Sequence, residues 1–243
     1  HVSQPLPASC LCVPMMAQGE MLGILHLRSG GPAASQTGQE QETVMASQQQ
    51  LAVTLAEHIA LALANLKLQE SLHRQAIRDP LTGLFNRRYL EETLERELRR
   101  AERRQIPLGI IMFDLEHFKK FNDTFGHAAG DVVLREIGAF LQDHVRAEDI
   151  ACRYGGEEFI VILPEARLED TLKRAEQLRE EVKQLHVRYR DQALGAVTVS
   201  LGVAVFPKHG STAEAILQAA DAALYRAKRE GRDRVVVASG ISA

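Results

Sequence analysis

A glycine pair between two apolar runs is the feature that most restricts how this chain can fold. Residues 150–152 (Ile-Ala-Cys) and 159–163 (Phe-Ile-Val-Ile-Leu) are strand-like, and Gly155 and Gly156 lie between them. Glycine adopts the positive φ values that tight hairpin turns require, so the stretch predicts a β-hairpin. Glu157 and Glu158 then lie at the hairpin tip, where two solvated carboxylates are the simplest interpretation.

A second acidic residue upstream favours a chemical role for that tip. Residues 107–113 form an apolar run that predicts a buried strand, and Asp114 ends it. Two carboxylate centres at strand ends or turns suit a hard cation such as Mg²⁺, which takes oxygen ligands. Asp114 by itself would be interpreted as a strand-end cap.

The remainder of the chain after Pro80 alternates between helical and strand-like patterns. We expect helices over 87–104, capped by Asn86, and over 130–145, 168–185 and 212–229, with further strands over 197–205 and 235–237. This order predicts an α/β (α+β) domain with one mixed or antiparallel sheet covered by helices.

Residues 1–75 form a region of their own. Apolar runs at 11–16 and 21–27 around Gly19 predict a second hairpin, and 30–38 is a loop by composition. No Pro or Gly occurs over 41–78, which predicts a long helix that ends before Pro80. Its apolar residues occupy nearly every face, so we expect it to be buried against the hairpin and a partner helix.

Composition excludes some classes of protein. The 243 residues are 45% hydrophobic and 25% charged, typical of a soluble globular protein. A net charge of −3 argues against a nucleic-acid polymer as partner through a broad basic surface. No uninterrupted apolar run is long enough to span a bilayer, and no signal-peptide layout is present. The opening residues His1-Val2-Ser3 predict a fragment of a longer protein.

Three cysteines, Cys10, Cys12 and Cys152, form no disulfide framework or zinc spacing, which favours a reducing, cytoplasmic location. Cys10 and Cys12 are two apart on a predicted strand and therefore share a face. Such a pair could bind metal, but no other clustered ligands support this in the sequence. Buried or half-buried thiols are the favoured interpretation.

The hairpin stretch over 153–159, Arg-Tyr-Gly-Gly-Glu-Glu-Phe, resembles the signature of GGDEF-domain diguanylate cyclases, with Glu157 in the variable third position. The stretches at 79–88 and 223–232 resemble further motifs of the same family. The resemblance covers residues 76–243 and implies the ferredoxin-like palm of nucleotide cyclases. Residues 1–75 resemble the C-terminal part of a GAF sensory domain, with its strand pair and last long helix.

The family resemblance implies a metal site and its catalytic residues. The metal ligands would be Asp114, the backbone carbonyl of Leu115, and Glu157, with Mg²⁺ or Mn²⁺ as the cofactor. Glu157 is also a candidate general base for a ribose 3′-hydroxyl, and Glu158 is the second essential acid of the signature. Glu116 stands where the family often has Asp, and its longer side chain keeps the charge.

Base recognition is implied for Asn122 and Asp131, whose spacing after Asp114 matches the family. A carboxylate accepts guanine N1–H and N2–H₂ together, whereas adenine has no N1–H and would leave it unpaired. Further substrate contacts are implied for His117, Phe118, Lys119, Lys228 and Arg232. Outside the family context, each lysine is a surface charge and Asp131 is a residue that favours a helix N-terminus.

Arg146 and Asp149 match the Arg-x-x-Asp inhibitory site by which many such cyclases bind their product. A further basic residue from the next helix could complete it, and Lys173, Arg174 and Arg179 are the candidates. The alternative is an ordinary surface turn.

The resemblance implies that two GTP molecules are condensed to cyclic di-GMP with release of two pyrophosphates. The active species would be a homodimer, because each 3′-hydroxyl must reach the α-phosphate of the other nucleotide. The alternatives are an inactive GGDEF module that binds cyclic di-GMP or GTP as a sensor, and a structural coupling domain.

Overall fold

The computed structural model describes residues 9–29, 38–190 and 192–240. The chain divides into two compact units, His1–Arg74 and Gln75–Ala243. Within the described residues, the first unit contains a two-stranded sheet, and the second contains a six-stranded sheet and a short two-stranded one.

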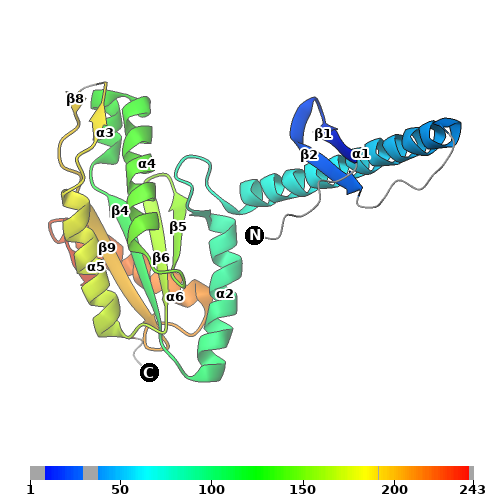
Figure 1. Cartoon of the computed structure of the whole chain (residues 1–243). Coiled ribbons are helices and arrows are strands. Elements are labelled where there is room, and N and C mark those ends of the chain that lie inside the picture. The colour runs from blue at the N-terminus through cyan, green and yellow to red at the C-terminus, as the bar shows by residue number, and fades with distance from the viewer. Residues whose placement is uncertain (1–8, 30–37, 191, 241–243) are drawn as a thin grey trace, which may run out of the picture. The chain divides into compact units, whose positions relative to one another are not determined.

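The first unit begins with the predicted hairpin. Strands β1 (Ser9–Ala17) and β2 (Glu20–Ser29) pair antiparallel, and the turn between them has positive φ at Gln18 and Gly19. Helix α1 (Gly38–Ile77) follows and ends before Pro80, as the sequence predicts (Figure 1).

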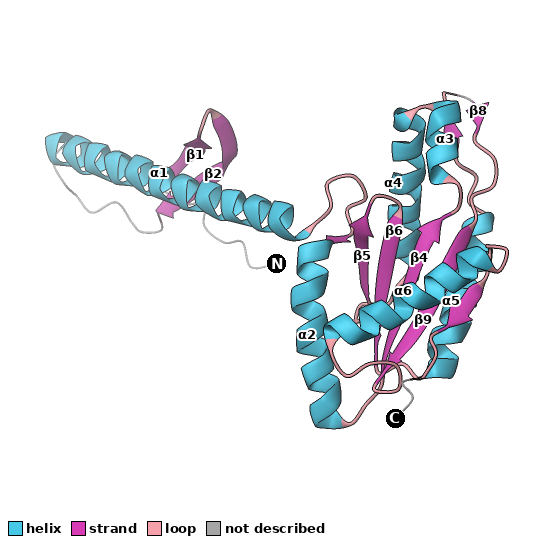
Figure 2. Ribbon diagram, turned by 180° about the vertical axis from the view of Figure 1, so that it is seen from behind, coloured by secondary structure: helices cyan, strands magenta, loops and turns pink. Residues whose placement is uncertain are grey.

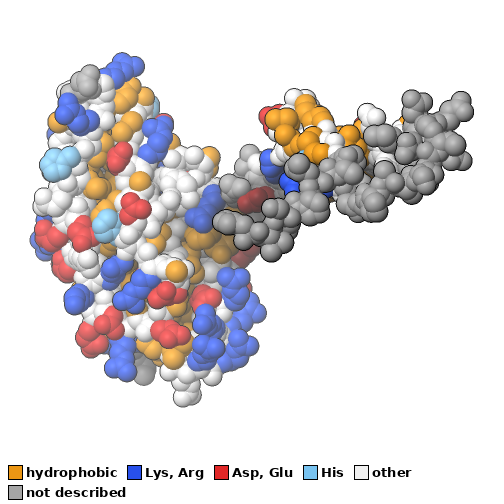
Figure 3. Space-filling model, viewed as in Figure 1, with side chains coloured by type: hydrophobic (Ala, Val, Ile, Leu, Met, Phe, Trp, Pro, Cys, Tyr) orange, Lys and Arg blue, Asp and Glu red, His pale blue; other side chains and the backbone are white. Residues whose placement is uncertain are grey.

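Helix α1 meets the hairpin through its small residues. Val13 of β1 is buried with Ala52 and Ala56 of α1, and Leu11, Met15 and Leu25 pack around them. The hairpin does not cover the large side chains: within the single chain, exposed on α1 are Leu51, Val53, Leu55, Ile59, Leu61, Leu66, Leu68 and Leu72. Burial against a partner helix stays a prediction. A two-stranded hairpin covers only one stripe of a helix, and the stripe that it covers is made of alanines. Figure 3 shows the apolar side chains that gather over β1 and β2.

The segment Ala46–Leu72 of α1 is long and apolar enough to cross a membrane, judged by length and composition alone. Its mean hydropathy is 1.4, and 17% of the window is buried. Polar residues interrupt every apolar run of this segment, but its mean hydropathy still meets the criterion. The criterion is weak by itself, since core helices of water-soluble proteins also meet it.

The sheet of the second unit has the strand order β10-β9-β4-β6-β5-β3. Its strands are β3 (Phe85–Asn86), β4 (Leu108–Leu115), β5 (Ile150–Gly155), β6 (Glu158–Pro164), β9 (Val199–Phe206) and β10 (Val235–Val237). Strand β4 pairs antiparallel with both β6 and β9, while the outer pairs β3–β5 and β9–β10 are parallel. The predicted mixed sheet is therefore confirmed. The short sheet pairs β7 (Arg188–Tyr189) with β8 (Gln192–Ala193).

Helices cover both faces of this sheet, as Figures 1 and 2 show from opposite sides. One face packs against α4 (His127–His144) and α5 (Leu168–Lys183), and the other against α2 (Arg87–Arg104) and α6 (Ala213–Arg229). Alternation along β4 divides the two cores. Ile111 and Phe113 face α4 and α5, whereas Ile110 and Met112 face α2 and α6.

The predicted cap of α2 is confirmed, and the predicted boundaries lie within a few residues of the observed ones. Asn86 caps α2 by accepting from Tyr89 N at 3.0 Å, and Thr212 caps α6. Asp114 is the second-to-last residue of β4, which runs one residue further than predicted. The fourth helix begins at His127 rather than at residue 130, because Gly126, with φ 85°, separates it from α3 (Phe118–Phe125).

Candidate functional site

Strand pairing brings two acids together at one end of the sheet. Asp114 of β4 is the direct partner of Glu158 of β6, and on its other side it is paired with Ser200 of β9. Asp114 follows Ile110 and Met112 in the alternation and therefore points to the α6 side of the sheet. Gly156, with φ 44°, makes the turn that places Glu157 beside them.

A lysine of α6 partly neutralises this acidic cluster. Lys228 Nζ lies 2.9 Å from Asp114 Oδ2, and Asp114 itself is 7% exposed. Burial raises the pKa of Asp114, with the charge of Glu116 adding to it and Lys228 opposing it. The pKa values of Glu157 and Glu158 are raised by partial burial and by the charge of Asp114. The site therefore holds more negative charge than its one lysine balances.

Glu116 is committed to a neighbouring contact. Arg232 Nε lies 2.8 Å from Glu116 Oε2, and the hydroxyl of Ser200 donates to the other carboxylate oxygen. The Glu116 side chain is 4% exposed, whereas that of Arg232 is 49% exposed. Arg232 therefore sits at the edge of the acidic cluster with much of its guanidinium open to solvent.

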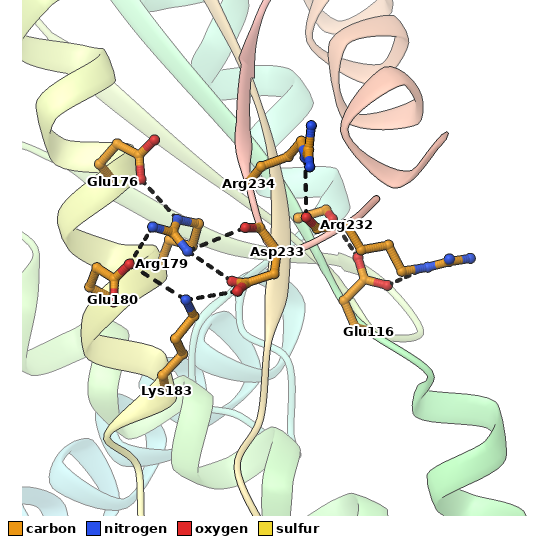
Figure 4. A network of polar contacts seen from close by, with 9 residues as sticks. Glu116, Glu176, Arg179, Glu180, Lys183, Arg232, Asp233 and Arg234 are labelled. Atoms are coloured by element: carbon orange, nitrogen blue, oxygen red, sulfur yellow. Dashed lines mark hydrogen bonds and ion pairs between the residues drawn. The ribbon is translucent and has the colours of Figure 1, made fainter. Parts of the chain in front are cut away.

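Residues on α5 hold the loop that carries Arg232. Asp233 receives hydrogen bonds from Arg179 at 2.9 Å and from Lys183 at 2.8 Å (Figure 4). Glu176 and Glu180 pair with Arg179 on the other side. Arg232 and Asp233 both have positive φ, 60° and 45°, so side-chain contacts keep the loop in a backbone conformation that non-glycine residues rarely adopt.

The turn of residues 79–84 is tied to the hairpin tip. Asp79 accepts from Thr82 N at 2.8 Å and from Thr82 Oγ1 at 2.7 Å. Arg153 donates to both oxygens of Asp79, at 3.2 and 3.3 Å, and to the carbonyl of Gly156, at 3.0 and 2.8 Å. Arg153 thus connects the start of the domain to the turn that bears Glu157.

The two residues expected to recognise a base come from adjacent helices. Asn122 lies on α3, and Asp131 lies in the second turn of α4. Asn122 Oδ1 is buried and has no hydrogen-bond partner among the described residues. A Cβ on Gly130 would lie 1.9 Å from that oxygen, so only glycine leaves room for Asn122 in this position.

The neighbouring residues His117, Phe118 and Lys119 stand at the start of α3. His117 has φ 57°, and Lys119 is exposed. The Phe118 side chain is buried in the core against Phe121, so only its backbone is placed to meet a ligand.

Comparison with known proteins identifies the second unit. A family model described as "Diguanylate cyclase, GGDEF domain" matches residues 76–234. The chain belongs to the GGDEF family. Response regulator PleD of Caulobacter vibrioides is 45% identical over 163 residues, which cover 66% of this chain and 36% of PleD.

Two solved structures of GGDEF proteins resemble this chain. The coiled coil and GGDEF domain of DgcB from Caulobacter crescentus, in complex with c-di-GMP, has a TM-score of 0.71 and 35% identity. The match covers 78% of this chain and 100% of that one. The active GGEEF domain of a diguanylate cyclase from Vibrio cholerae has a TM-score of 0.59 and 32% identity over 63% of this chain and 97% of that one. Residues 155–159 of this chain read GGEEF as well.

A groove of about 730 Å³ lies elsewhere on the GGDEF domain. Arg146, Asp149, Lys173 and Arg174 line it, together with acidic residues of α2 and α5. Asp149 accepts from Arg146 N at 2.9 Å. Burial raises the pKa of Asp149, and the bond from Arg146 N and the charge of Arg174 oppose it. Of the three basic residues that the sequence left open, Lys173 and Arg174 line the groove and Arg179 does not.

Sequence reasoning missed the contacts that hold the GGDEF site in shape. The ion pair of Asp79 with Arg153 joins residues 74 apart, and Glu116 and Ser200 are 84 apart. Asp79 is explained locally by its turn, where it accepts from Thr82, so the sequence gives no separate signal for the first of these. For the contact between Glu116 and Ser200, the signal in the sequence is the acidic residue at position 116.

Proposed function

We propose that this protein is a diguanylate cyclase, which condenses two GTP into cyclic di-GMP and two pyrophosphates. The observation that carries the proposal is the convergence of Asp114, Glu157 and Glu158 beside Lys228. The family description and the active GGEEF relative support it.

The donor set fits a divalent cation. The acidic cluster offers oxygen atoms only, and burial, together with mutual repulsion, raises the pKa values of its members. Asp114, Glu157 and the backbone carbonyl of Leu115 would hold Mg²⁺ or Mn²⁺, both of which prefer oxygen ligands. When bound, the ion supplies positive charge against the triphosphate and the developing charge of the reaction.

The reaction forms a phosphoester bond and breaks a phosphoanhydride bond. The 3′-oxygen of one GTP forms a bond to the α-phosphorus of the other, and the bond from that phosphorus to the bridging oxygen breaks, releasing pyrophosphate. The 3′-hydroxyl proton passes to a base, for which Glu157 is the candidate because it lies on the exposed turn. A second, identical exchange closes the ring. Glu158, which is the strand partner of Asp114, would help to orient the other acidic side chains of the cluster.

Phosphate binding is assigned to the edge of the acidic cluster. Arg232 has an exposed guanidinium, and Lys228 would shift from Asp114 toward a phosphate once other positive charge is bound. Lys119 and the backbone of His117 and Phe118, at the start of α3, would contact the other side of the triphosphate.

Guanine recognition is assigned to Asn122 and Asp131. The unpaired Asn122 Oδ1 supports this, because a buried acceptor without a donor is costly and a ligand N–H would satisfy it. The Asp131 carboxylate would accept from the N1–H and N2–H₂ edge, which distinguishes guanine from adenine.

The active species would be a homodimer, since each 3′-hydroxyl must attack a nucleotide held by another domain. The exposed leucines of α1 support association through this helix. The hairpin and α1 would be the tail of a GAF-type sensory domain, as their order and mutual packing suggest.

Product would bind in the groove at Arg146 and Asp149, with Arg174 or Lys173 as the additional cation. These residues precede β5, whereas the GGEEF turn follows it, so the two sites are about 20 Å apart along the strand. Product bound in the groove would therefore act by holding catalytic domains apart rather than by displacing GTP, which is allosteric inhibition.

Incubation of the protein with GTP and Mg²⁺, followed by chromatography of the products, tests the proposal. Cyclic di-GMP and pyrophosphate should form in the wild type and be absent in Asp114→Asn. Binding of GTP or cyclic di-GMP without turnover by the wild type would instead support the sensor alternative.

A further inference from the structure

The outer face of the β1–β2 hairpin carries a cluster of metal-binding side chains. In the strand register Cys12 is the partner of His26, and Cys10 is the partner of Arg28. Alternation places these residues opposite Leu11 and Val13, which pack against α1. Cys10, Cys12 and His26 are therefore exposed, which corrects the expectation of buried or half-buried thiols.

The three side chains converge on one point. His26 Nδ1 lies 3.0 Å from Cys12 Sγ and 3.5 Å from Cys10 Sγ. One ligand atom from each residue lies within 4.8 Å of the others. Tetrahedral zinc, with Zn–S bonds of about 2.3 Å and Zn–N bonds of about 2.0 Å, separates sulfur and nitrogen ligands by about 3.5 Å. The cluster thus has nearly the spacing that three corners of such a site require.

We propose that Cys10, Cys12 and His26 bind one Zn²⁺ ion through two thiolates and the imidazole Nδ1. Two soft sulfur ligands select zinc over Mg²⁺, which prefers the oxygen ligands of the GGEEF site. Three protein ligands leave the fourth tetrahedral position open to water or to an exogenous donor. The site therefore differs from the catalytic cluster in ligand chemistry as well as in sequence position.

Binding requires a rearrangement of protons at the cluster. Arg28 Nε donates to His26 Nε2 at 3.0 Å, which places the imidazole proton on Nδ1. Zinc on Nδ1 moves that proton to Nε2, and the exposed Arg28 side chain must turn away. Both thiols lose their protons, so zinc affinity should rise with pH.

The test uses the full chain in a non-thiol reductant, with Co²⁺ as a spectroscopic substitute for Zn²⁺. Thiolate coordination gives sulfur-to-cobalt charge-transfer absorption that carboxylate ligands do not give, so the catalytic cluster does not contribute. We expect the band to saturate at one Co²⁺ per chain and to disappear when one equivalent of Zn²⁺ is added. Competition with a chromophoric chelator then measures the zinc affinity.

Variants identify the ligands. Cys12→Ser and His26→Ala should each weaken zinc binding by at least about tenfold, since loss of even an outer partner of a metal ligand has effects of this size. Cys152→Ala is the matched control, because Cys152 is fully buried in the GGDEF domain and should leave the band unchanged. Circular dichroism should be the same for the exposed-site variants and the wild type.

A band that persists in the double variant Cys12→Ser/His26→Ala, or that is lost in Cys152→Ala, would overturn the assignment. So would a wild-type zinc affinity no greater than that of the double variant.

Discussion

Loss of the Asp79–Arg153 contact should destabilise the GGDEF domain and loosen its GGEEF turn. Asp79 holds Thr82 through two hydrogen bonds and pairs with Arg153, and Arg153 in turn holds the carbonyl of Gly156. The side chains of Arg153 and Asp79 are only 16% and 18% exposed. The ion pair is therefore largely buried.

The expected magnitude follows from these contacts. Removing one partner of a buried ion pair costs about 3–5 kcal/mol, and a hydrogen bond contributes about 1 kcal/mol. Residual exposure and the remaining Arg153–Gly156 contacts reduce the effect, so Asp79→Ala should lower the free energy of unfolding by about 3 kcal/mol. Asp79→Asn keeps an acceptor for Thr82 but loses the ion pair, and should cost about 1–2 kcal/mol.

Urea denaturation followed by tyrosine fluorescence measures the change. All four tyrosines, Tyr89, Tyr154, Tyr189 and Tyr225, lie in the GGDEF domain, and the chain has no tryptophan, so the signal reports on that unit. A double-mutant cycle of Asp79→Asn with Arg153→Gln should give a coupling energy of about 1–2 kcal/mol.

The effect should also depend on pH. Burial tends to raise the pKa of Asp79, but the hydrogen bonds from Thr82 and the charge of Arg153 outweigh it and lower the pKa. A carboxyl group whose pKa is lowered by folding stabilises the fold at pH values above its unfolded-state pKa of about 3.9. This stability is lost as the pH falls through the folded-state pKa. The difference between wild type and Asp79→Asn should be constant at neutral pH and shrink in acid. A coupling below about 0.5 kcal/mol, within the usual error of additivity, would refute the reasoning.

Further predictions concern the proposed activity. Glu158→Gln and Asp114→Asn should abolish cyclic di-GMP formation on chromatography, because each removes one carboxylate of the acidic cluster; product formed by both variants would contradict the assignment. Asp131→Ala should raise KM for GTP and narrow the preference over ATP in a pyrophosphate-release assay; unchanged selectivity would contradict the guanine assignment. Gly130→Ala should weaken GTP binding in calorimetry, because its methyl group would displace Asn122. Arg146→Ala should keep the initial rate but remove inhibition by added cyclic di-GMP in progress curves, and equal inhibition of both proteins would show that Arg146 belongs to an ordinary surface turn.

Local chemistry in the sequence determined the elements of the fold and their order. Gly156 takes positive φ in the turn of the hairpin that its sequence predicts, and Asn86 caps the helix that follows it. These features depend on residues a few positions apart, which is why they could be predicted. The GGEEF stretch likewise identified the family before any contact was known.

Only the tertiary structure decided which side chains meet. The register of β4 against β6 places Asp114 opposite Glu158, and alternation turns Asp114 toward Lys228. Packing of α1 through small alanines left its leucines exposed, and pairing across the hairpin joined His26 to two thiols that the sequence showed only as an isolated pair. Such contacts depend on strand register and on which helix face is covered, and both are set by the balance of packing across the whole domain rather than by neighbouring residues.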